Sequence, residues 1–437
     1  MTRIVTPGVL LSDSEVFRMS VDGFRFLHAA DIHLDSPLRG LSRYEGVPAE
    51  AVRTATREAL DNLVELAIRE GVAFLVIAGD LYDGDWEDFG TGLFFCGAMR
   101  RLADAGIDVF LLYGNHDADS SITRKLPLPP NVHVFPHRAP GTFEHAATGT
   151  LLHGQSYRDR DPGGNLALAY PAAASGRFNV GVLHTCLQGD PEHAPYSPCE
   201  PAELAARGYD YWALGHVHGF AIVGEGPHIV FPGNLQGRSV RETGPKGAAL
   251  VTVDAGSVAV VEHVPLDVVR WARVEVDASG LSTAADVEAA VRTALLRARD
   301  HEAAGRPLVV RVEISGATEA HDALVGRRQD LREDVRAVAA GVSERIWIEK
   351  VRLRTTREAT ATQGAAGDDL SALLAAAGGD PELREVLRRD FADLAGRLPA
   401  DLGGDSEPIA AVRAGEFDGI VARAAESLRL RLAGGRA

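Results

Sequence analysis

Five short motifs supply side chains that could bind metal ions. Each places aspartate, histidine or asparagine at or just after an apolar run that reads as a buried strand. They are Asp31-Ile32-His33, Gly79-Asp80, Gly114-Asn115-His116-Asp117, His184 and Gly215-His216-Val217-His218. A single Asp-x-His in a loop is more often a cap or a solvated turn, and each other motif alone has a similarly ordinary explanation. Together they offer the carboxylate, imidazole and amide ligands that a pair of divalent cations needs.

Hydrolysis of a phosphate ester is the chemistry that such a set suits. A phosphodiester is anionic and repels hydroxide, while water is a weak nucleophile at neutral pH. Two cations about 3.5–4 Å apart lower the pKa of a bound water, neutralise the phosphate oxygens and hold the attack in line. One carboxylate must bridge both ions, and Asp80, central in the set, is the natural choice.

The charge balance argues against binding of phosphate by a basic surface. The 437 residues include 45 Lys and Arg against 61 Asp and Glu, a formal net charge of -16. A protein that binds nucleic acid by bulk electrostatics is usually basic. Any phosphate-bearing substrate must therefore be held by local features, such as bound cations or a small group of arginines.

Composition also excludes several protein classes. The hydrophobic share of 46% and charged share of 24% are those of a globular protein. No apolar run is long enough for a membrane span, and the first residues lack the apolar core of a signal peptide. The scattered Cys96, Cys186 and Cys199 form neither a disulfide framework nor a zinc knuckle. We expect a cytoplasmic protein with no membrane association.

Alternating strands and helices must position the five motifs. We predict strands at 24–30, 72–80 and 107–117, separated by helices at 48–70 and 86–105. Strands that are apolar on both faces and separated by helices indicate a largely parallel, covered sheet. Later strands are predicted near 132–135, 150–153, 179–185, 209–214, 228–232, 247–253 and 258–264.

The pattern changes after the last of these strands and divides the chain into parts. Residues 267–354 read as βαβαβ, with helices at 282–301 and near 319–340, and carry fifteen basic and fifteen acidic side chains. We predict a flexible N-terminal extension (1–22), an α/β domain (23–266), a small α/β cap (267–354), a linker (355–368) and a helical tail (369–437). Helical patterns in the tail lie at 369–377, 381–397 and 408–433.

The order of the motifs resembles that of the calcineurin-like metallophosphoesterase superfamily. Within it, the chain is similar to the SbcD-type DNA repair exonucleases and most closely to their YhaO-like branch. The segments that carry this resemblance are HAADIHLDSPLRG (28–40), AGDLYD (78–83), YGNHD (113–117), LGHVH (214–218) and FPGNLQGRSVRETGPKG (231–247). The resemblance covers about residues 24–265 and rests on architecture alone from 267 onward.

The resemblance implies a fold and a set of partners. The fold would be a four-layer metallophosphoesterase sandwich, an α/β class, followed by a cap that contacts DNA and a tail that docks a partner. The partner would be an SMC-like coiled-coil ATPase of the SbcC or YhaN type. A homodimer is also compatible with the sequence.

The resemblance also assigns roles to the motif residues. One metal would be held by Asp31, His33, Asp80 and His218, and the other by Asp80, Asn115, His184 and His216. The preferred ion would be manganese. His116 would protonate the leaving 3′ oxygen or orient the phosphate, and pairing of His116 with either Asp83 or Asp117 stays open.

Several further residues have two interpretations each. His28 is a core or sheet-edge residue or else a metal ligand, and Asp35 is a partner of a metal-binding histidine or a turn cap. Asn234, Arg238 and Arg241 lie in a Gly-rich loop that contacts phosphates or is simply solvated. His153 and Cys186 are expected to be structural. The cap arginines form a phosphate-tracking stripe or, with the interleaved acids, an ordinary solvated helix; they are Arg327, Arg328, Arg332 and Arg336.

The activity predicted from these features is hydrolysis of DNA phosphodiester bonds from an end, with two manganese ions. The alternative is a small-molecule or cyclic-nucleotide phosphodiesterase of the same superfamily. Protein phosphatases of this class usually carry an Arg soon after the Gly-Asp motif and a GNHE motif. The segments GDLYDGD and GNHD disfavour that branch. A non-enzymatic subunit that only anchors DNA is disfavoured by the complete ligand set.

Overall fold

The computed structural model describes residues 23–36, 49–83, 89–118, 127–187, 196–224, 226–358, 380–397 and short pieces between 376 and 428. Several predicted segments lie outside the described residues: the extension 1–22, the helix 369–377 except Ala376, most of the linker and most of the helix 408–433. The chain divides into two compact units, Met1–Ala272 with His301–Val309, and Arg273–Asp300 with Val310–Ala437.

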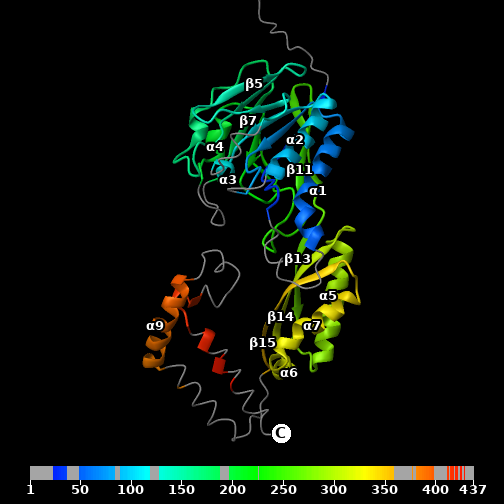
Figure 1. The fold of residues 1–437 in the computed structure, drawn as a ribbon, viewed down its shortest axis with the longest axis vertical. Coiled ribbons are helices and arrows are strands. Elements are labelled where there is room, and N and C mark those ends of the chain that lie inside the picture. Colours follow the sequence, from blue (N-terminus) through cyan, green and yellow to red (C-terminus); the bar gives the residue numbers. More distant parts are fainter. Residues whose placement is uncertain are drawn as a thin grey trace, which may run out of the picture. The chain divides into compact units, whose positions relative to one another are not determined.

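Two six-stranded sheets form the first unit (Figure 1). The first sheet has the order β12-β11-β1-β2-β3-β4 and the second β5-β6-β7-β8-β10-β9. Strands β1, β2, β3 and β4 run parallel, as do β6, β7, β8 and β10. The first sheet consists of β1 (Phe24–Ala29), β2 (Phe74–Ala78), β3 (Asp108–Leu112), β4 (Val132–Val134), β11 (Gly247–Asp254) and β12 (Ser257–Pro265). The second consists of β5 (Gly141–His145), β6 (Thr150–Gly154), β7 (Asn179–His184), β8 (Tyr211–Gly215), β9 (Ala221–Val223) and β10 (His228–Phe231).

Alternating side chains of the parallel strands fill two different cores. In β2, Leu75 and Ile77 pack with the helices α1 (Ala49–Glu70) and α2 (Phe89–Asp104). Phe74 and Val76 point the other way and pack against the second sheet. A third apolar cluster covers the outer face of the second sheet beneath η1 (Leu166–Ala169) and α4 (Pro201–Ala205). Helices, sheet, sheet and helices make four layers, so the predicted four-layer α/β sandwich is confirmed.

The second unit contains a three-stranded sheet of order β13-β14-β15. Its elements are β13 (Arg270–Asp277), α5 (Ala284–His301), β14 (Leu308–Thr318), α6 (His321–Gly326), α7 (Arg328–Ala340) and β15 (Ile346–Arg357). The single helix expected near 319–340 is two helices, because the backbone leaves the helical range at Arg327 (φ -104, ψ 21). Arg327 forms an ion pair with Asp334, and Arg336 forms one with Glu333, as is typical of a solvated helix. The phosphate-tracking stripe of arginines stays a prediction.

Two strands of the first unit were not predicted, β5 and β9. They are the outer strands of the second sheet, and their side chains are largely half-buried or exposed. Edge strands bury only part of their surface, so their sequences lack the apolar run that reveals a central strand. The tail helix α9 (Pro381–Arg397) matches the predicted range. Among the described helices, none has the length and apolar character that a bilayer crossing requires.

Candidate metal centre

Parallel strands bring all five motifs to one edge of the two sheets. Asp31 and Asp80 follow the neighbouring strands β1 and β2, and Asn115 begins the short helix α3 (Asn115–Ala118) after β3. His184 ends β7, and His216 follows the adjacent strand β8. The loops after β1 and β2 run side by side, because backbone amides of 31, 33 and 34 donate to the carbonyls of 79, 80 and 81. The motifs that are far apart in the sequence therefore meet in one place.

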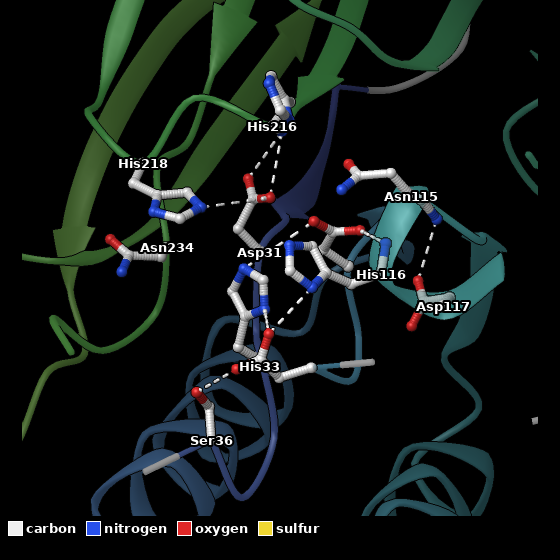
Figure 2. A network of polar contacts seen from close by, with 12 residues as sticks. Asp31, His33, Ser36, Asn115, His116, Asp117, His216, His218 and Asn234 are labelled. Atoms are coloured by element: carbon white, nitrogen blue, oxygen red, sulfur yellow. Dashed lines mark hydrogen bonds and ion pairs between the residues drawn. The ribbon is translucent and has the colours of Figure 1, made fainter. Parts of the chain in front are cut away.

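Ligand atoms of the motif residues converge in two groups that share Asp31. Asp31, His33 and His218 form one, and Asp31, Asp80 and His184 the other; within each group the ligand atoms lie within 4.8 Å of one another. Figure 2 shows Asp31, His33, His116 and His218 turned toward a common centre. Asp31 and Asp80 are nearly fully buried, so their charges are removed from water.

Asp80 belongs to the second group and also approaches His33 of the first, as a bridging ligand would. Its Oδ2 is 3.9 Å from His33 Nε2 and 3.5 Å from His184 Nε2. Asn115 Oδ1 is 2.9 Å from His184 Nε2. His216 contributes its backbone amide to Asp31 Oδ2 at 2.9 Å, and its ring packs 5.3 Å from that of His184. The seven predicted ligands are thus neighbours, and the division between two ions stays a prediction.

The backbone at this edge is held in an unfavourable conformation. Asp31, His33, Asp80 and His216 have positive φ values of 50, 45, 51 and 99°. Each such residue costs of order 1–3 kcal/mol and persists only where the surroundings impose it. Gly79 is required between strand and ligand, because a Cβ there would lie 2.4 Å from His184 Nδ1. Four candidate ligands in a strained backbone are typical of a functional site.

Burial and neighbouring charges shift the pKa values of the site. Burial raises the pKa of Asp31, although His218 and His184 act in the opposite direction. Burial would also raise the pKa of Asp80, but His184 and His116 outweigh it and hold that pKa well below its usual range. Burial alone would lower the pKa of His184, whereas attraction by Asp80 and Asp31 raises it to about 9. Asp80 is therefore ionised at neutral pH, as a metal-binding carboxylate must be.

The residues present fit a pair of divalent cations. His33 is fully buried, and neither of its ring nitrogens has a hydrogen-bond partner among the described residues. A buried polar group without a partner costs about 1–3 kcal/mol, so such groups are normally satisfied. The site combines this unsatisfied imidazole with two buried carboxylates and further imidazoles. A cation bound by His33, Asp31 and Asp80 would satisfy the imidazole and compensate the carboxylates.

Two histidines are oriented by hydrogen bonds on the side away from the centre. His184 donates from Nδ1 to the carbonyl of Ala78 at 2.9 Å, which turns Nε2 toward Asn115 and Asp80 at the centre. His218 Nδ1 lies 2.8 Å from Glu242 Oε1, and Lys246 Nζ donates to the His218 carbonyl at 2.7 Å. Metal-binding histidines usually have such partners, which fix the tautomer and the ring orientation. Sequence reasoning missed Glu242 and Lys246; the only available signal was a charged pair in the Gly-rich loop after β10.

Asp83 is the partner of His116, and Asp117 is not. His116 Nδ1 lies 2.9 Å from Asp83 Oδ1, and Ser36 Oγ donates to Asp83 Oδ2 at 2.7 Å. The carboxylate of Asp117 instead accepts backbone amides from Leu81, Tyr82 and Gly114. Asp117 therefore fixes the two loops and does not orient His116, while its assignment as a catalytic residue stays a prediction.

The pKa values of this pair follow from their contact. Burial would raise the pKa of Asp83, but the hydrogen bond with His116 and the charge of Arg238 place it well below its usual range. Burial would lower the pKa of His116, whereas Asp83 and Asp80 raise it above the usual value. His116 contacts Asp83 through Nδ1, and its side chain is 31% exposed. The pair can therefore hold a proton and donate it from one defined atom, His116 Nε2.

The remaining candidates have structural surroundings. Asp35 binds Arg57 with both oxygens, at 2.7 and 2.6 Å, and also accepts from Thr91, so the contacts of its carboxylate within the described residues are with these two side chains and not with a metal-binding histidine. His28 is a core residue, bonded to Tyr211 and the Leu214 carbonyl.

His153 and Cys186 are structural, as expected. His153 is hydrogen-bonded to Thr142 and Asn179, and Cys186 is buried. In the Gly-rich loop, Asn234 and Arg238 are buried against the site, so the solvated-loop interpretation is wrong for them, while Arg241 is exposed.

Comparison with known proteins agrees with this geometry. Residues 24–220 match the calcineurin-like phosphoesterase family, the class that the four-layer fold and its donor set define. Residues 271–356 match the middle domain of metallophosphoesterase YhaO. Over 343 residues the chain is 31% identical to the uncharacterized metallophosphoesterase YhaO of Bacillus subtilis (strain 168), covering 77% of this chain and 83% of that protein. The chain belongs to the YhaO family of metallophosphoesterases.

Two more distant similarities extend beyond this family. The DNA double-strand break repair protein Mre11 of Methanopyrus kandleri is 26% identical over 211 residues, 44% of each chain. A dimetal phosphatase from Danio rerio is 14% identical, with a TM-score of 0.34 over 54% of this chain and 93% of that one.

Proposed function

We propose that the chain is a manganese-dependent DNA exonuclease that hydrolyses phosphodiester bonds from an end. The observation that carries this proposal is the His116–Asp83 pair beside the metal centre. Cleavage of DNA expels an alkoxide, a strong base that leaves readily only if it is protonated. His116 Nε2 is the atom that would deliver this proton, and such transfer contributes roughly 10²–10⁴-fold to a rate.

The ligand set supports manganese as the ion. Imidazole nitrogens together with carboxylate and amide oxygens form the mixed shell that this ion accepts in six-fold coordination. When bound, a pair of divalent cations activates the attacking water and neutralises charge on the phosphate. The residues that would hold the ions are Asp31, His33, Asp80, Asn115, His184, His216 and His218. The Ala78 carbonyl orients His184, and Glu242 orients His218.

A cavity beside the centre supports a substrate larger than a simple ester. Its volume is about 910 Å³, and it shares Asp117 and Ala118 with the helix that carries His116. Tyr113 and Phe135 line it, and Arg138 and Arg158 are exposed at its border. A volume of this size accommodates a nucleotide next to the scissile phosphate. The similarity to a DNA double-strand break repair protein also favours DNA.

A role with an SMC-like ATPase partner is part of the proposal. The tail helix α9 exposes Leu383 and Val386 at 37% and 38%, three residues apart on one helical face. Apolar side chains at this spacing suit docking of another helix. A second copy of this chain is the other possible occupant, and size measurement with and without the partner separates the two.

The test is hydrolysis by purified protein with and without Mn²⁺. The substrates are end-labelled duplex DNA, cyclic AMP and a nitrophenyl phosphodiester. Release of nucleotides from the DNA ends that requires Mn²⁺ is the expected result. Turnover of cyclic AMP with intact DNA would contradict the proposal and favour the cyclic-nucleotide alternative.

A further inference from the structure

Arg238 places a buried positive charge behind the metal centre. The residue is 9% exposed, and its Nε and Nη1 have no hydrogen-bond partner within the described ranges. Its Nη2 lies 3.4 Å from Glu242 Oε1, and its Nη1 lies 3.7 Å from Asp83 Oδ2. Burying a charge is costly unless carboxylates compensate it. Arg238 therefore lies between Asp83 and Glu242, and its one positive charge compensates both carboxylates.

Both acids are the partners of histidines that have different tasks. Asp83 Oδ1 lies 2.9 Å from Nδ1 of His116, the predicted proton donor. Glu242 Oε1 lies 2.8 Å from Nδ1 of His218, a predicted metal ligand. One guanidinium thus approaches the acid of each histidine, and its Nη2 also lies 3.5 Å from His218 Nδ1.

The loop that carries Arg238 is held rigidly. Glu242 Oε2 accepts the Arg238 backbone amide at 2.6 Å and the Asn234 side chain at 2.9 Å. Trp271 Nε1 donates to the carbonyl of Gly237 at 2.8 Å. A Cβ at Gly237 would lie 2.8 Å from the Glu242 carbonyl, so the turn is close-packed. The position of the guanidinium is therefore fixed by the fold.

We propose that Arg238 is a positioning residue that acts on His116 through Asp83 and on His218 through Glu242. Its charge lies within ion-pair distance of both carboxylates and holds them in place, so each histidine keeps its proton on Nδ1 and presents Nε2 to the site. The His116 branch of this inference rests on the proposed function. The His218 branch concerns metal binding and does not depend on the identity of the substrate.

The test compares substrates that differ in their leaving group. A bis-nitrophenyl phosphodiester expels a weak base that needs no proton, whereas a dinucleotide expels an alkoxide. Mn²⁺ binding is measured separately by calorimetry, which requires no turnover. For Arg238→Met we expect Mn²⁺ affinity to fall by about tenfold, and the dinucleotide rate to fall at least about tenfold more than the nitrophenyl rate.

Single-branch variants provide the reference. Asp83→Asn should reduce mainly the dinucleotide rate, and Glu242→Gln should weaken Mn²⁺ binding and reduce both rates equally. The exposed Arg69, changed to Met, is the control and should match the parent protein in both measurements; its side chain is 65% exposed. If the parent protein hydrolyses neither substrate, the proposed function fails, while the Mn²⁺ measurement still tests the His218 branch.

Two outcomes would overturn the inference. In the first, Arg238→Met lowers the dinucleotide and nitrophenyl rates equally and leaves the Mn²⁺ affinity unchanged. That result would show that Arg238 contacts the substrate phosphate directly. In the second, Arg238→Lys behaves like the parent protein in both measurements. Lysine keeps the charge but cannot span two carboxylates, so we expect losses of the same two kinds, smaller than for Met. This second variant also decides the matter if Arg238→Met does not fold.

Discussion

Buried His28 should make the folding stability of the first unit depend on pH. The imidazole is fully buried in β1, where Nε2 donates to the Leu214 carbonyl and Tyr211 donates to Nδ1. Burial lowers the pKa of His28 from 6.5 to about 3, against a smaller effect of the Leu214 carbonyl in the other direction. The folded protein therefore requires the neutral form, whereas the unfolded chain binds a proton below pH 6.5.

The magnitude follows from the two pKa values. Because the folded value is the lower one, stability is complete above the unfolded pKa and is lost as the pH falls toward the folded pKa. At pH 5 the unfolded chain is about 1.5 units below its pKa, which corresponds to a loss of about 2 kcal/mol. Desolvation by burial, the cause of the shift, acts only in the native state.

Urea unfolding at pH 7.5 and pH 5.0 measures this loss. We expect His28→Gln, which retains a donor and an acceptor but does not titrate, to lose about 2 kcal/mol less than the parent protein between these pH values. Other histidines titrate in both proteins and cancel in the difference. His137, exposed to solvent, provides the control variant His137→Gln, which should follow the parent protein. An equal loss for the parent and His28→Gln would refute the reasoning.

The site gives four further predictions. Asp80→Ala should abolish hydrolysis and Mn²⁺ binding in calorimetry, and unchanged turnover would contradict the metal centre. Gly114→Ala should weaken Mn²⁺ binding at least about tenfold, because the new Cβ would lie 2.3 Å from Asp80 Oδ1; unaltered affinity would show that the loop can move. His116→Gln should keep Mn²⁺ but lose about 10²–10⁴-fold in DNA hydrolysis, and parallel loss of metal would make His116 a ligand. Changing Arg138 and Arg158 to Glu should raise KM for DNA and leave KM for a nitrophenyl diester unchanged. An unchanged KM for DNA would show that DNA does not enter the cavity.

Central strands and their terminal motifs could be predicted because their signals are local. Apolar residues on both faces of β1, β2 and β3 identify covered parallel strands, and polar residues that follow such strands meet at one sheet edge. The edge strands β5 and β9 could not be found in this way, since they are only partly buried. Arg327 likewise gave no signal that the helix expected over 319–340 would be divided.

Pairings between side chains were beyond the sequence. In the sequence, Asp83 and Asp117 are equally plausible partners of His116. The structure shows that Asp83 contacts His116 and that Asp117 accepts backbone amides instead. Glu242 lies 24 residues from His218, and no periodicity or spacing links the two.

Residue types and strand patterns along the chain thus identify the candidate ligands and the strands that carry them. Only the folded structure shows which ring nitrogen of His116, His184 and His218 is held by a partner and which partner holds it. The physical reason is range: strand periodicity acts between neighbours along the chain, whereas a hydrogen bond depends on distances of tenths of an ångström between segments joined only by packing.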